Sequence, residues 1–98
     1  MPAIVASGSW IYAEAVARPV DIIAVDYDFW HELARADGEL EPGESAQPPD
    51  ANGLLYYVRF RNAGEPVERA WPDSAGHDTI DAAKRTAETR VPGRITWT

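Results

Sequence analysis

The stretch from residue 53 to residue 62, GLLYYVRFRN, constrains the fold more than any other part of the chain. It has the highest density of strand-favouring residues, and turn-forming Asn-Gly and Asn-Ala-Gly sequences lie at its two ends. With the period of a β-strand, one face carries Leu54, Tyr56, Val58 and Phe60, and the other carries Leu55, Tyr57, Arg59 and Arg61. The first face is apolar apart from a phenol and the second ends in two cations. This is typical of a central antiparallel strand with one face on a core and the other partly exposed to water.

Two stretches before this strand alternate in a similar way. Residues 10–16 and 20–27 predict an antiparallel hairpin. We place its turn at Arg18-Pro19, because proline fixes its own φ and restricts the residue before it. Residues 3–6 form a short apolar run that fits either an edge strand or a lead-in to the hairpin.

The residues after the central strand predict two short strands with a helix between them. Residues 66–71 begin with a proline, which suits an edge strand, and residues 94–98 form the last strand. The helix spans residues 78–90, with Asp78 as its N-cap. Its inward stripe is narrow and rich in alanine, and consists of Ile80, Ala83, Ala87 and Val91. Such a helix should lie close against a sheet.

Residues 28–36 allow two interpretations. Asp28 can cap a short helix that ends before Gly38, or the preceding strand can continue as far as Trp30. Residues 37–52, which come next, are acidic and rich in proline and glycine. They predict a long loop that is mobile in the free protein, because they offer little apolar surface to bury.

These elements predict one domain, residues 1–98, of the α+β class. We expect an antiparallel sheet of about five strands in the order β-β-β-β-α-β, with the helix of the C-terminal half packed on it. A short helix or a loop separates the second strand from the third. The alternative is an SH3-like, partly closed barrel built from strongly twisted hairpins.

The charge of the chain excludes one class of partner. The net charge is −7, and residues 1–50 carry ten acidic side chains against two arginines. Because nucleic-acid binding needs a basic footprint, we expect no nucleic-acid partner. No apolar run is long enough to cross a membrane, and there is no cysteine, so we expect a cytoplasmic protein without membrane contact. The eight arginines against one lysine suggest GC-rich coding and hence a bacterial source.

Two carboxylates and a histidine are the candidates for an enzyme, which is the least favoured class. Asp26 and Asp28 face the same way on a strand, and His31 follows. The structural interpretation is that these acids pair with Arg59 and Arg61, which have the same spacing, on the adjacent strand. We favour that interpretation and assign no catalytic residue.

The remaining candidates are aromatic and acidic side chains. The aromatic binding candidates are Trp10, Trp30, Tyr56, Trp71 and Trp97, and the acidic surface consists of Asp37, Glu39, Glu41 and Glu44. The acids lack the spacing of a calcium-binding EF-hand, and no phosphate-binding loop occurs, so we expect no metal and no cofactor. Exposed tryptophans are enriched at interfaces. The chain is therefore interpreted as a non-enzymatic protein-interaction, regulatory or inhibitor module. The alternative is a small-molecule binding module with a pocket of Trp10, Tyr56 and Trp71.

The last strand also predicts a homodimer. Ile95 and Trp97 point to one side, and no later residues could cover them. If residues 94–98 lie at a sheet edge, a second copy could pair with the backbone and bury Trp97 near a two-fold axis. In the competing arrangement this strand lies inside the sheet, with Trp97 under the helix.

Overall fold

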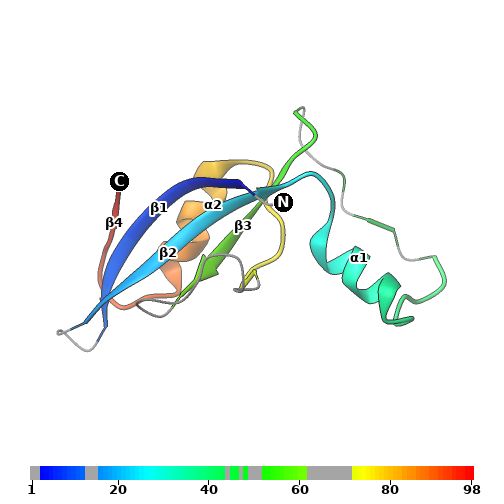
Figure 1. Ribbon diagram of the computed structural model, residues 1–98, viewed down its shortest axis with the longest axis horizontal. Helices are drawn as coiled ribbons and strands as arrows, with labels where there is room; N and C mark the ends of the chain where they lie inside the picture. The colour runs from blue at the N-terminus through cyan, green and yellow to red at the C-terminus, as the bar shows by residue number, and fades with distance from the viewer. Residues whose placement is uncertain (1–2, 13–15, 44, 47, 49–51, 62–71) are drawn as a thin grey trace.

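The computed structural model describes residues 3–12, 16–43, 45–46, 48, 52–61 and 72–98. In this part of the chain the elements are β1 (Ala3–Tyr12), β2 (Val16–Val25), α1 (Phe29–Ala36), β3 (Leu55–Phe60), α2 (Ile80–Thr89) and β4 (Ile95–Trp97). The strands form one antiparallel sheet in the order β3-β2-β1-β4, and α2 lies against one face of it (Figure 1). The predicted α+β class is confirmed. The sheet is open, so the SH3-like barrel is not confirmed, and the fifth strand predicted at residues 66–71 lies outside the described residues.

The β1–β2 hairpin is longer than the sequence predicted. Ala3–Tyr12 is one strand with a register irregularity between Ile4 and Ala6, and Tyr12 lies opposite Val16. The turn predicted at Arg18-Pro19 is wrong, because Pro19 lies within β2. Its carbonyl accepts a hydrogen bond from the Arg61 backbone N–H at 3.2 Å. In an antiparallel pair, an N–H at this position would also point toward Arg61, which lies just beyond the end of β3. Proline therefore removes at most one hydrogen bond, at the end of the β2–β3 ladder.

The two faces of the central strands both carry an apolar cluster, whereas the sequence predicted one core face and one face partly exposed to water. On the α2 face, the buried residues are Val20, Ile22, Ala24, Tyr56, Val58, Ala83, Ala87 and Ile95. On the opposite face they are Ile23, Val25, Leu55 and Tyr57, against which Phe29 packs. Ala83 and Ala87 are fully buried, which confirms that α2 lies close to the sheet. Its N-cap is Thr79 and not Asp78: the Thr79 hydroxyl accepts from the Ala82 N–H at 3.0 Å.

A glycine permits the close pairing of β4 with β1. Gly8 lies directly opposite Trp97, and a Cβ at Gly8 would lie 2.7 Å from the Thr96 carbonyl oxygen and 2.9 Å from Trp97 Cε3. Any larger residue would therefore push β4 outward. Ile95 turns into the core on the α2 face. The C-terminal strand thus lies at the edge of the described sheet, as one of the two predicted arrangements has it.

The Trp97 side chain is partly covered by α2, as the competing arrangement predicted, although its strand lies at an edge. The indole packs against the core on the α2 face, and its Nε1–H points to Glu88 Oε2 at 3.4 Å. The Lys84 Nζ lies 5.2 Å from the ring centroid, within reach of a cation–π contact. The cover comes from α2, an element that precedes the strand in the sequence.

Residues 28–36 adopt the helical alternative. Asp28 is the N-cap of α1, and its Oδ1 accepts from the His31 N–H at 3.1 Å. Gly38 follows the helix with a φ of 71°, a left-handed conformation that glycine accepts without strain. The helix stands away from the sheet and α2, beyond the end of β2 (Figure 1). No helix or strand occurs in the described part of residues 37–52, where a loop was predicted.

Candidate functional site

A buried ion cluster crosses the face of the sheet opposite α2. Asp21 is fully buried, and its Oδ2 accepts from Arg59 Nη2 at 3.0 Å and from Arg61 Nε at 2.6 Å. The Ser7 hydroxyl donates to its Oδ1 at 3.0 Å. Burial by itself would raise the pKa of Asp21, but the hydrogen bonds from Arg61, Arg59 and Ser7 outweigh it and hold the pKa below its usual value. The carboxylate therefore stays ionised, which suits a structural role and not proton transfer.

This cluster corrects the pairing that the sequence predicted. Arg59 and Arg61 do bond a carboxylate of the adjacent strand, but the residue is Asp21 and not Asp26 or Asp28. In the observed register Asp21 lies opposite Arg59, whereas the ladder ends at the Val25–Leu55 pair before Asp26 is reached. The strands were correctly assigned as neighbours, and the carboxylate was not.

The proposed acid–base residues occupy separate environments. Asp26 is exposed just beyond β2. Asp28 serves as the cap of α1. The His31 Nδ1 lies 3.9 Å from Glu32 Oε1, its neighbour in the same helix. Among the described residues, no three histidine, aspartate or glutamate side chains gather as the ligands of a metal would.

Tyr56 belongs to the core on the α2 face, and Trp10 and Trp97 pack against that core. Trp30 lies on α1, and Trp71 lies outside the described residues. Trp10 packs edge-on against Tyr12 and Phe60, with ring centroids 5.9 and 6.4 Å apart. Tyr56 lines a hollow of about 390 Å³ beside the start of α2, and Trp10 does not line it. The predicted pocket of Trp10, Tyr56 and Trp71 stays a prediction, because Trp71 lies outside the described residues.

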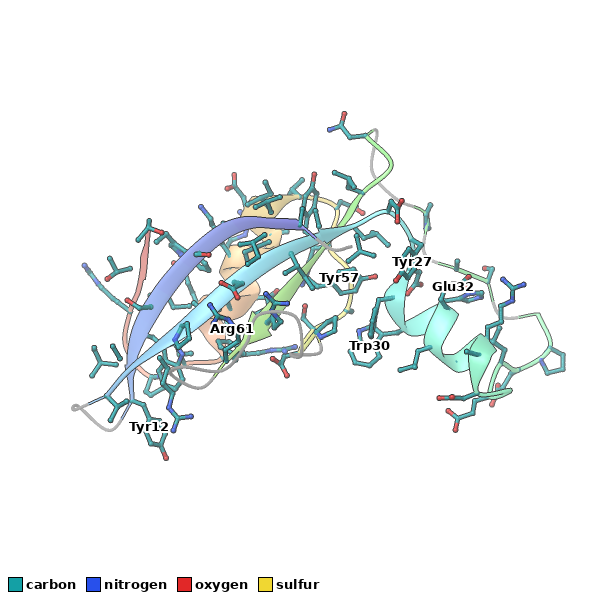
Figure 2. All side chains as sticks on the ribbon, viewed as in Figure 1. Tyr12, Tyr27, Trp30, Glu32, Tyr57 and Arg61 are labelled. Carbon is teal, nitrogen blue, oxygen red and sulfur yellow. The ribbon has the colours of Figure 1, made fainter. Side chains whose placement is uncertain are left out.

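Helix α1 is attached to the body at its N-terminal end. The Phe29 N–H donates to Tyr57 Oη at 2.7 Å, and the Tyr57 hydroxyl donates to the Tyr27 carbonyl at 3.3 Å. Burial raises the pKa of Tyr57 and keeps it a neutral hydroxyl that can make both bonds. Trp30 points from α1 back toward the sheet (Figure 2), where its Nε1–H donates to the Ser74 carbonyl at 2.7 Å. Tertiary contacts therefore fix the direction in which α1 leaves the sheet.

The same helix buries none of its eight residues. Trp30, Leu33 and Ala34 form an apolar stripe at the spacing i, i+3, i+4, and Trp30 remains 38% exposed. Glu32 lies on another side of the helix and pairs with Arg35 at 3.6 Å. Helix α1 thus leaves part of its apolar stripe exposed to solvent.

The acidic candidates continue from the end of this helix, in residues 37–41, which we call the acidic segment. Asp37, Glu39 and Glu41 are exposed, and Glu44 lies outside the described residues. Together with Glu32, the acidic segment makes the outer end of the molecule negative.

A hollow of about 280 Å³ lies where β2 passes into α1. Its lining mixes polar and apolar surface, and consists of Ala3, Val5, Ala24, Val25, Asp26, Tyr27 and Leu54. Ala24, which lines this hollow, is the cross-strand partner of Tyr56, which lines the hollow beside α2. The two hollows therefore flank one pair of residues at the same end of the sheet.

Two residues of this region were missed by sequence reasoning. Asp21 lies between the apolar residues Val20 and Ile22, and a lone acid in such a run signals a buried and paired carboxylate. That signal could have identified Asp21 as the partner of the arginines. Tyr57 was placed on the correct face, but nothing in its sequence neighbourhood indicates that its hydroxyl holds α1.

Among the described residues, no helix is long and apolar enough to cross a bilayer. No family model, no curated protein sequence and no solved structure matches this chain.

Proposed function

We propose that this protein is an interaction module that docks onto a partner protein through α1 and the acidic segment. One observation carries the proposal: α1 is held firmly by the body of the protein and yet buries none of its own residues. A helix of eight residues is too short to persist alone in water, so its contacts with Tyr57 and Ser74 are needed to form it. These contacts present the helix in advance of binding, which lowers the entropy that a partner must restrict.

The apolar stripe supports a groove as the partner's binding surface. Trp30, Leu33 and Ala34 have the spacing by which amphipathic helices insert into apolar grooves. Tryptophan is enriched among the residues that dominate binding energy. The partial exposure of Trp30 leaves part of its ring available for such a contact while its N–H holds the helix in place.

The charges around this stripe support a basic rim on the partner. Glu32 lies on the same helix as the apolar stripe, and the acidic segment follows the end of that helix in the sequence. Opposite charge on the partner would steer association and fix the orientation of docking. The partner that fits is therefore a protein with an apolar groove bordered by lysine and arginine, as a target of a small acidic inhibitor or regulator would have.

Comparative affinity capture tests this function. The intact protein and a Leu33→Glu variant serve as baits in lysate of the source organism, and captured proteins are quantified by mass spectrometry. The matched control is Ile11→Glu, which adds the same charge at an apolar residue, 53% exposed, in the hairpin at the opposite end of the molecule. We expect a basic protein that Leu33→Glu loses and Ile11→Glu retains, and calorimetry on the purified pair should repeat that order. Equal recovery by both variants would contradict docking through α1.

A further inference from the structure

The hollow at the end of β2 combines aliphatic side chains with one carboxylate. Val5, Val25 and Leu54 supply aliphatic surface, and Asp26 supplies the charge. Asp26 makes no hydrogen bond or ion pair with any residue that the structure describes. Its charge is therefore available to a ligand.

Tyr27 lines the same hollow. Its side chain is 46% exposed at the junction of β2 and α1 (Figure 2). The Tyr57 hydroxyl donates a hydrogen bond to the backbone carbonyl of Tyr27 at 3.3 Å, which holds the main chain of Tyr27 in place. A partly exposed tyrosine face next to an available carboxylate attracts cations by two separate interactions.

We infer that this hollow receives one long cationic side chain, an arginine or lysine of the partner that α1 engages. The inference rests on the proposed function for the source of that side chain. The volume of about 280 Å³ is at the lower limit of ligand pockets, which suits a single side chain and not a cofactor. The aliphatic stem lies along Val5 and Leu54, and the charged end stays near water beside Asp26 and Tyr27.

Charge and position both favour this occupant. An anion would meet Asp26 on a chain of net charge −7, and a purely apolar ligand would cover the carboxylate without pairing it, which costs free energy. Asp26 and Tyr27 directly precede Asp28, the cap of α1. A partner that lies along α1 would therefore come close to these two residues of the hollow.

Titration of the intact ¹⁵N-labelled protein with capped arginine, N-acetyl-arginine-N-methylamide, tests the inference by NMR. We expect saturable shifts of the backbone amides of Val5, Leu54 and residues 24–27. The citrulline analogue has nearly the same shape without the charge, and it should bind about two- to fivefold more weakly, the size of one exposed ion pair. Equal affinity for the two probes would overturn the inference.

Two variants separate the hollow from general attraction to an acidic protein. Asp26→Asn should lose the preference for arginine over citrulline, whereas Glu39→Gln removes the same charge from the acidic segment and should keep it. The spectra also show whether each variant is folded. If Asp26→Asn still prefers arginine over citrulline, the hollow is not the site. The same conclusion follows if Glu39→Gln loses this preference.

n-Propylguanidine distinguishes the source of the cation. It carries the guanidinium and its stem with the same single charge and without a peptide group, so tighter binding of n-propylguanidine than of capped arginine would replace the partner's side chain with a free small cation. Leu33→Glu should leave the arginine shifts unchanged, because Leu33 does not line the hollow. Failure of the hollow and failure of docking through α1 are therefore distinguishable.

Discussion

Asp21 lies directly opposite Arg59 across β2 and β3, and both side chains are buried on the face of the sheet that α2 does not cover. Ser7 lies opposite Asp21 on the other side, so one row of three strands carries a hydroxyl, a carboxylate and a guanidinium in hydrogen-bonding contact. Each charge in this row has its partner within the sheet. The burial of the row is tolerated only because these bonds are made.

Replacing Asp21 should destabilise the fold strongly. Asp21→Asn leaves Arg59 and Arg61 without their carboxylate, and the loss of one partner of a buried pair costs about 3–5 kcal/mol. Urea unfolding should show this cost as a lower midpoint. The matched control is Asp26→Asn at an exposed carboxylate, which should change stability by no more than about 0.5 kcal/mol. Similar midpoints for the two variants would mean that the cluster contributes little.

The same cluster should make stability depend on acid pH. The folded-state pKa of Asp21 lies below the value near 3.9 of an unfolded chain, so the cluster's contribution is fully present above that value. It is lost as the pH falls through the folded-state pKa, because protonation then breaks the ion pairs. Urea midpoints measured from neutral to strongly acidic pH should fall more steeply for the parent than for Asp21→Asn. Parallel curves would argue against a lowered pKa.

Gly8→Ala should displace β4 without unfolding the rest of the sheet. The added Cβ would meet the Thr96 carbonyl and the Trp97 ring, and such overpacking costs about 1–3 kcal/mol. Hydrogen exchange should become faster at the Thr98 amide, which bonds the Ser7 carbonyl, and stay slow in β3. Ser9→Ala, at the next position of β1, is the control and should leave β4 in place.

Tyr57→Phe should loosen α1. It removes the acceptor of the Phe29 N–H and the donor to the Tyr27 carbonyl, at a cost of about 1 kcal/mol or somewhat more. Amide exchange in α1 should accelerate by about five- to tenfold while α2 stays protected. Tyr12→Phe at the hairpin end should change neither helix.

Amide hydrogen exchange on the parent protein also tests the predicted mobility of residues 37–52. Strong protection of these amides in the free monomer would contradict that prediction.

Self-association through β4 stays a prediction that light scattering can decide. β4 is an edge of the described sheet, and we expect the intact protein to have the mass of a dimer. Trp97→Ala should yield a folded monomer if the indole contributes to the interface. Since Lys84 and Glu88 already contact this ring, circular dichroism must accompany the measurement. A monomeric parent, or a variant that unfolds without dissociating, would exclude the dimer.

Side-chain alternation predicted the faces of the central strands and the stripe of α2, because burial enforces a period of two in strands and of 3.6 in helices. Tyr56 and Val58 lie on the α2 face and Tyr57 and Arg59 on the other, as expected. The predicted turn at Pro19 failed because the pairing of β2 with both neighbours outweighs the local preference of proline for a turn. Local preference ranks conformations of a short segment, whereas strand register depends on contacts with distant segments.

The dependence on contacts with distant segments also explains which parts of the candidate site could not be predicted. The helix that begins after Asp28 could be anticipated from its cap, whereas its direction is set by Tyr57 and Ser74, which lie 29 and 46 positions after Asp28 in the sequence. The partner of Arg59 could not be chosen between Asp21 and Asp26 without the register. Spacing alone fits both acids, and only the observed pairing of β2 with β3 separates them.

The row of Ser7, Asp21 and Arg59 also restricts how this protein can evolve. Loss of Asp21 alone removes the carboxylate that Arg59 and Arg61 share, and loss of Arg59 alone leaves the buried carboxylate with fewer donors. A variant with only one of these residues replaced is therefore less stable than the parent. A sheet with apolar residues at all of these positions could nevertheless be as stable as the present one. Descendants of this chain should keep these residues together or exchange them together, so that the row is inherited as one unit.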